Sequence, residues 1–385
     1  MNGKEIKIAL VTTGHPPLDD RIFWKFARTL RVNGFDVAVI STTEEFISTV
    51  ESVRFLCFRG INYGKKEKIV ETGKRLLSFG PDIIICSEPL AVFAADRYRK
   101  KYNPDAKIIY DITEYYPQIG KGYIKYLYLN WLMMTALNLL AVRKSDRLII
   151  GEELKAKYYR KVTPSKQIDI IGYYSPLNIF NYFPPMKNKN IFTIGYTGLI
   201  SEERGINRFL EIFRLLKLQH KNLQIKALII GKFKDESTAR KIISELRRYP
   251  PGDYEIKEWT DYRNYAETIS GIDLCIDLRD KNRLFDNSLP IKLFDMIAAG
   301  RRTVITNLRS LKQIDDIEQA AIVTNPNDID FITGQINSYL SDPENFREDS
   351  LYIRKLAERK YNWEREGKNL IKIIYDLSYK SVLKK

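Results

Sequence analysis

Short apolar runs alternate with amphipathic stretches along the first half of the chain. The runs fall at residues 6–11, 37–40, 83–86, 108–110, 148–150 and 168–171. Within residues 22–30, apolar residues recur at helical spacing on one side: Ile22, Phe23, Phe26, Ala27 and Leu30. The basic residues there fall on the opposite side: Lys25, Arg28 and Arg31. Near-continuous apolar strands separated by helices are typical of a parallel sheet covered by helices on both faces.

A second series of the same kind follows an irregular stretch. Residues 173–190 hold three prolines and five aromatic residues without a clear period, so we interpret them as a linker between two domains. Beyond them the pattern predicts strands at 192–196, 225–230, 254–258, 274–278, 304–306 and 321–323. It predicts helices at 205–218, 236–247, 291–299 and 361–383. We therefore expect two α/β domains, at residues 1–172 and 191–361.

Length and composition agree with two folded domains. At 385 residues the chain is about twice the usual length of one domain. Hydrophobic residues make up 44% and charged residues 29%, a composition that excludes a disordered chain. The formal net charge of +15 favours anionic partners such as nucleotides, phospholipid surfaces or nucleic acid. No basic cluster is interleaved with aromatic residues on one predicted element, which disfavours nucleic acid.

Several other classes are disfavoured by particular residues. Three cysteines stand far apart without a CxxC pair, so neither a disulfide framework nor a thiolate metal site is indicated. Two histidines cannot form a multi-histidine metal centre, although carboxylates alone can hold magnesium. The first residues turn polar too soon for a signal peptide, so we expect a cytoplasmic location. Residues 123–142 are apolar enough for a membrane span, but Lys125, Asn130 and Asn138 within them favour a buried helix.

Candidate chemistry is expected beyond the carboxyl ends of the predicted strands, where parallel sheets bind ligands. No GxGxxG or GxxxxGK[ST] motif occurs, which disfavours a standard dinucleotide or P-loop site. After the first strand come His15, Asp19, Asp20 and Arg21, either at the mouth of a site or as a helix start with Arg21 on the surface.

Two segments of the second half have the residues of a phosphate site. In residues 196–206 (YTGLISEERGI), Gly198 follows a strand and Arg204 precedes a helix, a combination that suits a diphosphate. The alternative is a tight turn with a solvated arginine. In residues 286–300, Pro290 is placed to open a helix, with Lys292 in its first turn and Asp295 one turn further. The alternative is a core helix with Lys292 solvated.

Five segments together resemble a known family. GHPPLDDRIFWKFARTL, YDITEYYP, YTGLISEERGI, LPIKLFDMIAAGRRTVIT and the closing YNW…IYDL are similar to the retaining glycosyltransferases of family 4, in the same order. The resemblance implies the GT-B fold, two Rossmann-like doubly wound parallel-sheet domains facing across a cleft. It also implies that a nucleotide-diphosphate sugar binds the second domain, that an acceptor binds the first, and that the final helix, 362–385, returns to the first domain. Transfer would be metal-independent, with no cofactor.

The resemblance assigns roles to particular residues of the second domain. Gly198 matches the close-approach glycine, Arg204 the diphosphate contact, and Asp295 the ribose-binding second acid of an E-x7-E signature. The first acid of that signature is replaced by Asn287, and the second basic residue after the glycine by Leu199. The remaining donor contacts implied are Ser288, Leu289, Pro290 and Lys292. Lys292, Arg279 and Lys281 are candidates to compensate for Leu199, and Trp259, Thr260 and Tyr262 either flank the base or pack in the core.

On the acceptor side the resemblance implies His15, Asp19, Arg21, Thr113 and Glu114. Thr113 stands where the family usually has a histidine before the glutamate. A front-face retaining reaction needs little from a protein base, because the departing diphosphate oxygen takes the acceptor proton. The catalytic residues would then be Arg204, Lys292 and Asn287, with Arg204, Lys292 and the helix start stabilising the leaving group.

The expected substrates are a UDP- or GDP-sugar and a glycan or lipid-linked acceptor, in cell-surface polysaccharide biosynthesis. An apolar helix at 123–142 with Lys121, Lys125, Arg143 and Lys144 at its ends suggests docking on an anionic membrane surface. Two alternatives stay open: a nucleotide-sugar epimerase or hydrolase of the same fold, and a non-catalytic sugar-nucleotide-binding protein.

Overall fold

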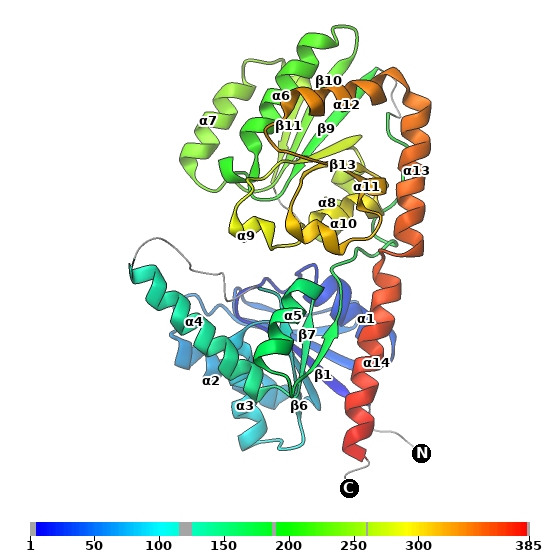
Figure 1. The fold of residues 1–385 in the computed structure, drawn as a ribbon. Coiled ribbons are helices and arrows are strands. Elements are labelled where there is room, and N and C mark those ends of the chain that lie inside the picture. The colour runs from blue at the N-terminus through cyan, green and yellow to red at the C-terminus, as the bar shows by residue number, and fades with distance from the viewer. Residues whose placement is uncertain (1–4, 115–124, 187–189, 259–260, 383–385) are drawn as a thin grey trace. The chain divides into compact units, whose positions relative to one another are not determined.

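The structure, a computed structural model, describes residues 5–114, 125–186, 190–258 and 261–382 (Figure 1). The chain divides into two compact units. The first unit comprises Met1–Tyr173 and Arg365–Lys385, and the second comprises Tyr174–Glu364. Each unit contains one largely or wholly parallel sheet with helices against it, so the predicted α/β architecture is confirmed.

The first unit has an eight-stranded sheet in the order β3-β4-β2-β1-β5-β6-β7-β8. All neighbours are parallel except β3 and β4, which form an antiparallel hairpin. Ile8 on β1 lies opposite Val37 on β2 and Ile83 on β5, all of them buried. The strands are β1 (Lys7–Thr12), β2 (Asp36–Ser41), β3 (Phe46–Val50), β4 (Val53–Cys57), β5 (Ile83–Cys86), β6 (Lys107–Ile112), β7 (Arg147–Ile150) and β8 (Gln167–Ile170).

The helices of the first unit begin with a π-helix, η1 (Ile22–Ala27), that continues into α1 (Arg28–Val32). The wider π turn brings Lys25 inward, where it is 1% exposed and its Nζ lies 3.4 Å from the Tyr173 carbonyl oxygen, so the prediction of a solvent-facing Lys25 is wrong. The other helices are α2 (Lys65–Phe79), α3 (Pro89–Lys101), α4 (Lys125–Lys144), α5 (Glu153–Val162) and α14 (Trp363–Val382). The first two residues of α14 belong to the second unit and the rest of α14 to the first.

The second unit has a six-stranded parallel sheet in the order β11-β10-β9-β12-β13-β14. Ile194 on β9 lies opposite Ala227 on β10 and Leu274 on β12. The strands are β9 (Ile191–Thr197), β10 (Gln224–Ile230), β11 (Tyr254–Lys257), β12 (Leu274–Asp277), β13 (Arg302–Thr306) and β14 (Ala321–Thr324). The α-helices are α6 (Ile206–Gln219), α7 (Glu236–Leu246), α8 (Tyr262–Ile269), α9 (Arg283–Asp286), α10 (Lys292–Ala298), α11 (Ile317–Ala320), α12 (Ile329–Ser341) and α13 (Pro343–Arg359).

Residues 174–186, predicted as part of a linker, are folded into the second unit. Tyr174 packs on Phe294 with ring centres 4.9 Å apart, and Phe180 is fully buried. Tyr173, in contrast, belongs to the first unit. Residues 187–189 lie outside the described residues. The chain therefore passes from one unit to the other between Tyr173 and Tyr174 and returns between Glu364 and Arg365.

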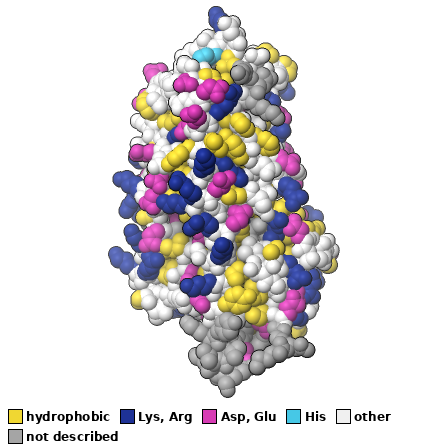
Figure 2. Space-filling model, turned by 90° about the vertical axis from the view of Figure 1, so that its right-hand side faces the viewer, with side chains coloured by type: hydrophobic (Ala, Val, Ile, Leu, Met, Phe, Trp, Pro, Cys, Tyr) yellow, Lys and Arg dark blue, Asp and Glu magenta, His cyan; other side chains and the backbone are white. Residues whose placement is uncertain are grey.

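The surface mixes charges of both signs. On the face drawn in Figure 2, basic side chains stand among acidic ones rather than in one block. A search of the described helices finds none that is long and apolar enough to cross a membrane.

Candidate functional site

Two glycines shape the carboxyl edge of the second sheet beside β9. Gly198 directly follows β9 with φ of +116°, a conformation that favours glycine, and a Cβ there would meet no described heavy atom within 4 Å. Gly205 has φ of +85°, and a Cβ there would lie 2.1 Å from the Leu278 carbonyl oxygen. The loop between them, with its short 3-10 turn η2 (Glu202–Arg204), is thereby held against the end of β12 and carries Arg204.

Arg204 is a half-buried cation beside a second arginine. The guanidinium carbons of Arg204 and Arg279 lie 5.4 and 5.6 Å from the centre of the same ring, Phe285. Asp277 accepts two hydrogen bonds from Arg279, one of them at 2.9 Å from Nε. Arg204 has no salt bridge or side-chain hydrogen bond among the described residues. Burial and the charge of Arg279 lower its pKa, so the surroundings disfavour its charged form and a bound anion would offset that cost.

Lys292 and Asp295 lie together on α10. Lys292 Nζ is 3.6 Å from Asp295 Oδ2 and 4.5 Å from the centre of the Tyr265 ring. Asp295 is 4% exposed, and its Oδ1 accepts hydrogen bonds from Ser175 Oγ at 2.6 Å and Tyr262 Oη at 2.9 Å. The sequence did not indicate these two hydroxyls. Asp295 is thus already held by protein groups, with Oδ2 on the side of Lys292.

The segment before α10 is bound back onto the short helix α9. Asn287 Nδ2 donates to the Arg283 carbonyl oxygen at 2.8 Å, and Ser288 Oγ donates to that of Leu284 at 2.9 Å. Neither side chain caps α10, which begins at Lys292 without a side-chain cap. Leu289 packs in the core beside α10 and Pro290 is buried. The contact of Asn287 and Ser288 with a donor sugar stays a prediction.

Of the residues proposed to flank a base, Trp259 and Thr260 lie outside the described residues. Tyr262 is 2% exposed, and its ring packs on Phe180 with ring centres 5.3 Å apart. Because its hydroxyl also donates to Asp295, Tyr262 belongs to the support of α10, as the packing alternative predicted.

In the first unit, the loop after β1 holds a histidine between two carboxylates. His15 Nδ1 lies 3.1 Å from Asp19 Oδ2, and His15 Nε2 lies 3.5 Å from Glu88 Oε1. Glu88 follows β5 and accepts hydrogen bonds from Thr12 Oγ1 at 2.7 Å and the Thr13 N–H at 2.8 Å. Burial alone would lower the pKa of His15, but the carboxylates raise it to about 9. At neutral pH His15 is therefore an imidazolium that donates hydrogen bonds and accepts no proton.

Glu88 was not among the predicted site residues. Its place gave a local clue, since it is an acid two residues after a buried strand and immediately before a helix that begins with Pro89. What the sequence did not reveal is that β1 and β5 are neighbours, which brings Glu88 to His15.

Arg21 does not lie on the surface. It is 3% exposed, and its Nε and Nη2 donate to Asp111, itself 2% exposed, at 2.7 and 2.8 Å. Nη2 also donates to the Ile171 carbonyl oxygen at 3.1 Å, and the guanidinium carbon lies 4.3 Å from the centre of the Tyr173 ring. Of the two alternatives for this segment, the one with Arg21 on the surface is wrong, because Arg21 pairs with the buried carboxylate of Asp111 on β6. Arg21 holds the loop to the sheet. Because its side chain is buried, an acceptor substrate would have little access to the guanidinium.

Thr113 and Glu114 follow β6 at the same edge of the sheet. The Thr113 carbonyl oxygen accepts a hydrogen bond from Lys155 Nζ at 3.0 Å. Its Oγ1 is buried without a hydrogen-bond partner among the described residues, and Glu114 is exposed. Only the Glu114 carboxylate is therefore exposed here, and the Thr113 hydroxyl is not. In the described ranges no three His, Cys, Asp or Glu side chains are grouped as metal ligands.

Comparison with known proteins identifies the fold. No family model and no curated protein matches the sequence. The structure is similar to sucrose-phosphate synthase from Thermosynechococcus elongatus, with a TM-score of 0.75 and 14% identity over 97% of this chain and 100% of that one. It is similar to HepE from Anabaena in complex with UDP and glucose (TM-score 0.69, 10% identity, 97% and 100% covered). It is also similar to a glycosyltransferase from Rickettsia africae (TM-score 0.67, 13% identity, 97% and 99% covered). At such identities the likeness shows the fold, and the chain has the two-domain GT-B fold.

Proposed function

We propose that this protein is a glycosyltransferase that takes a sugar from a UDP- or GDP-sugar. The observation that carries the proposal is Arg204, a half-buried cation that lacks a carboxylate partner among the described residues and stands beside Arg279 at the carboxyl edge of the sheet. A diphosphate supplies the anionic oxygens that this guanidinium lacks. The fold supports the same conclusion, since HepE, which shares it, was solved with UDP and glucose.

The proposed reaction is metal-independent and retains the anomeric configuration. The bond between the anomeric carbon and the diphosphate oxygen breaks, and a bond to the acceptor oxygen forms on the same face of the sugar. The acceptor proton passes to the departing diphosphate oxygen. Arg204 and Lys292 stabilise the negative charge on that oxygen. Asp295 holds Lys292 in place and accepts a hydrogen bond from a ribose hydroxyl. His15 is already protonated at neutral pH, which agrees with a route that needs no protein base.

For the acceptor we propose a glycan or lipid-linked glycan of the cell surface, glycosylated at the cytoplasmic face of a membrane. Leu132, Met133 and Leu140 on α4 are 43–45% exposed, and the exposed Arg143 lies one turn after Leu140. An apolar stripe that ends in a cation suits the boundary between acyl chains and anionic headgroups. Sedimentation with anionic vesicles at low salt should therefore remove the protein from solution. A protein that stays in solution, or that binds equally after Leu132→Ser and Leu140→Ser are combined, would contradict this part.

The function itself is tested in two steps. First, melting temperatures are compared across a panel of UDP-, GDP- and dTDP-sugars, and one donor class should raise the melting temperature. Second, release of nucleoside diphosphate from that donor is measured with and without a glycan acceptor mixture. Release that requires acceptor supports the transferase. Release without acceptor would instead indicate a hydrolase, and conversion of the donor into another nucleotide-sugar without release would indicate an epimerase. Binding without turnover would indicate a non-catalytic binding protein, an alternative suggested by Thr113 and Asn287.

A further inference from the structure

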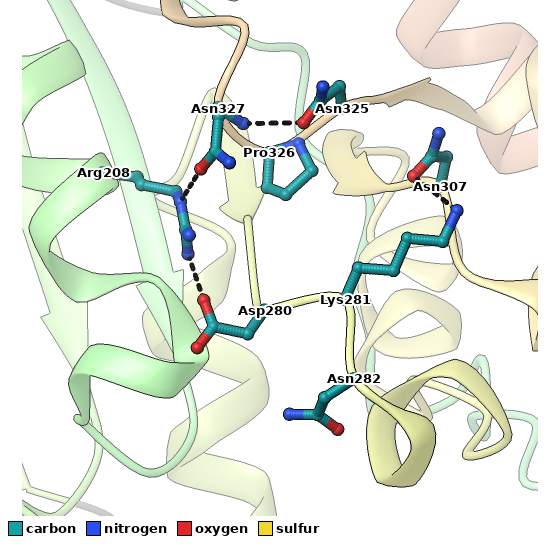
Figure 3. Close-up of a pocket in the computed structure, with 8 residues that line it drawn as sticks. All are labelled: Arg208, Asp280, Lys281, Asn282, Asn307, Asn325, Pro326 and Asn327. Carbon is teal, nitrogen blue, oxygen red and sulfur yellow. Dashed lines mark hydrogen bonds and ion pairs between the residues drawn. The ribbon is translucent and has the colours of Figure 1, made fainter.

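The described residues of the second unit contain an open, polar hollow of about 510 Å³ that the proposed reaction does not use (Figure 3). It lies at the carboxyl ends of β12, β13 and β14, and Arg208 on α6 closes one side. Its lining includes neither Arg204, Lys292 nor Asp295. The hollow is therefore a separate site, although Asp280 in its wall directly follows Arg279. Lys281, a candidate above to compensate for Leu199, lines this hollow, with its Nζ 3.3 Å from Asn307 Oδ1.

The side-chain oxygens of the asparagines around the hollow all accept hydrogen bonds from protein groups. Asn327 Oδ1 accepts from Arg208 Nε at 2.9 Å, and Asn325 Oδ1 accepts from the Asn327 N–H at 3.1 Å. Asn307 Oδ1 accepts from Lys281 Nζ at 3.3 Å. In the described structure the three amide nitrogens have no acceptor, so the groups left for a ligand are N–H donors. Asn282 follows the same rule, since its Oδ1 caps α9 by accepting from the Phe285 N–H.

The charges of the lining point the same way. Arg208 and Lys281 contribute two cations and Asp280 one carboxylate, and that carboxylate is bound by Arg208 Nη1 at 2.8 Å. No aromatic side chain lines the hollow, so nothing there would stack on a base or a sugar ring. A neutral sugar would need acceptors as well as donors for its hydroxyls. A ligand that only accepts hydrogen bonds and carries negative charge fits better.

We propose that this hollow binds an oxyanion, a phosphate or a carboxylate group, through the amide nitrogens of Asn307, Asn325 and Asn327 and the ammonium of Lys281. The anion is carried either as free phosphate or on an acidic sugar. The site goes beyond the proposed transferase reaction and stands or falls separately from it.

The first substitutions of the test change only the amide nitrogen of an asparagine. Asn307→Asp and Asn327→Asp keep the oxygens that contact Lys281 and Arg208 but replace each N–H donor by an acceptor with negative charge. Asn222→Asp makes the same change on the exposed loop before β10, at the opposite edge of the sheet. Lys281→Gln is a second variant that removes the positive charge of an exposed side chain, so misfolding is not a concern. For the phosphate measurements all variants are made in the full chain together with Arg204→Ala, so that phosphate bound at the proposed donor site does not add to the measured binding.

Equilibrium dialysis with radiolabelled inorganic phosphate at constant ionic strength is the measurement. We expect saturable binding of one phosphate per chain, weakened about tenfold or more by Asn307→Asp, Asn327→Asp or Lys281→Gln and unchanged by Asn222→Asp. Displacement of the phosphate by glucuronate would show that the hollow also takes the carboxylate of an acidic sugar. If glucuronate does not displace it, the ligand is phosphate itself. Absence of saturable binding, equal loss in Asn222→Asp, or displacement by glucose would overturn the proposal. Asn307→Asp is also made alone, with Arg204 kept. Its melting shifts with nucleotide-sugars should equal those of the unsubstituted chain, which separates this result from the outcome for the donor site.

Discussion

Arg204 illustrates how a single residue can be costly to the fold and useful to a ligand. Its guanidinium is half-buried and near Arg279, without a carboxylate within salt-bridge distance in the described structure. Two other arginines of this chain, Arg21 and Arg279, have carboxylate partners. The absence of such a partner at the carboxyl edge of a parallel sheet is what makes the residue a candidate for binding diphosphate.

We therefore expect Arg204→Ala to reduce nucleotide-diphosphate affinity and acceptor-dependent transfer by about 10- to 100-fold, since a charge-assisted hydrogen bond contributes about 1.5–3 kcal/mol. The free energy of unfolding should change by about 0.5 kcal/mol or less, because no intramolecular salt bridge is lost. Calorimetry with the nucleotide and urea unfolding measure the two effects. Arg214→Ala is the control and should alter neither, since Arg214 is an exposed arginine on α6, the helix that follows the η2 turn with Arg204. Full turnover in Arg204→Ala would remove this residue from the site.

His15 makes a pH-dependent contribution whose sign follows from its surroundings. The folded chain raises its pKa from 6.5 to about 9, so the contacts with Asp19 and Glu88 stabilise the fold fully below about pH 6.5. That stabilisation is lost as the pH rises from about 6.5 to 9. The free energy of unfolding of the wild-type chain should fall across this window more steeply than that of His15→Gln.

The titration itself is directly measurable because the chain has only two histidines, His15 and His220. In an NMR titration, the imidazole signal that disappears in His15→Gln should titrate near pH 9. A midpoint near the ordinary value of 6.5 would contradict the carboxylate clamp and would restore His15 as a base at neutral pH.

At the scale of elements, the ion pair between Arg21 and Asp111 joins three parts of the first unit. It connects the loop before η1 to β6, and Arg21 also reaches the carbonyl oxygens of Ile171 and Gly172, which follow β8. Charged groups this deeply buried are tolerated only when they are paired and fully hydrogen-bonded. The loop that presents His15 and Asp19 is therefore anchored to the sheet by its own far end.

Asp111→Ala should lower the free energy of unfolding by about 3–5 kcal/mol, because it leaves the Arg21 charge buried and unpaired. Urea unfolding measures the effect. The control is Glu153→Ala, which breaks an exposed pair with Arg160 and should cost about 1 kcal/mol or less. If Asp111→Ala proved no more destabilising than this control, the pair would not be the anchor described here. Replacing both Arg21 and Asp111 by apolar residues should cost less than Asp111→Ala alone.

The predicted elements succeed or fail according to how local their physical cause is. The apolar run at residues 83–86 coincides with β5, since a parallel strand buried on both faces must be apolar throughout. The hairpin of β3 and β4 was not predicted, because β3 is largely exposed and its turn places Glu51 and Ser52 at positive φ without glycine or asparagine. Lys25 was misplaced because periodicity assumes 3.6 residues per turn and η1 is wider.

At the scale of the whole molecule, the two units differ in which parts of the sequence form them. The second unit is one continuous segment, Tyr174–Glu364, whereas the first needs residues from both ends of the sequence. In the closing helix Leu370 and Ile374 are fully buried, and Tyr375 packs on Phe35 with ring centres 5.5 Å apart. Burial of each such side chain contributes about 1.5–3 kcal/mol, so the first unit depends on this helix.

We expect a fragment of residues 174–364 to unfold cooperatively by itself and to bind the nucleotide that the full chain binds. A fragment of residues 1–173 should lack a cooperative thermal transition until a peptide of residues 365–385 is supplied. Circular dichroism on heating, with and without the peptide, measures this. A cooperative transition of the 1–173 fragment at the temperature of the full chain would show that the closing helix does not belong to the first unit.

Local chemistry in the sequence determined most of the strands, the α/β class and the candidates Gly198, Arg204, Lys292 and Asp295, because apolar periodicity and short motifs are properties of neighbouring residues. Sheet order decided the rest. Only when β1 lies beside β5 does Glu88 meet His15, and only when three strand ends converge do four asparagines line one hollow. Arg21 and Asp111 are likewise 90 residues apart in the chain, and their pairing is decided by which strands share an edge, a property that no local pattern contains.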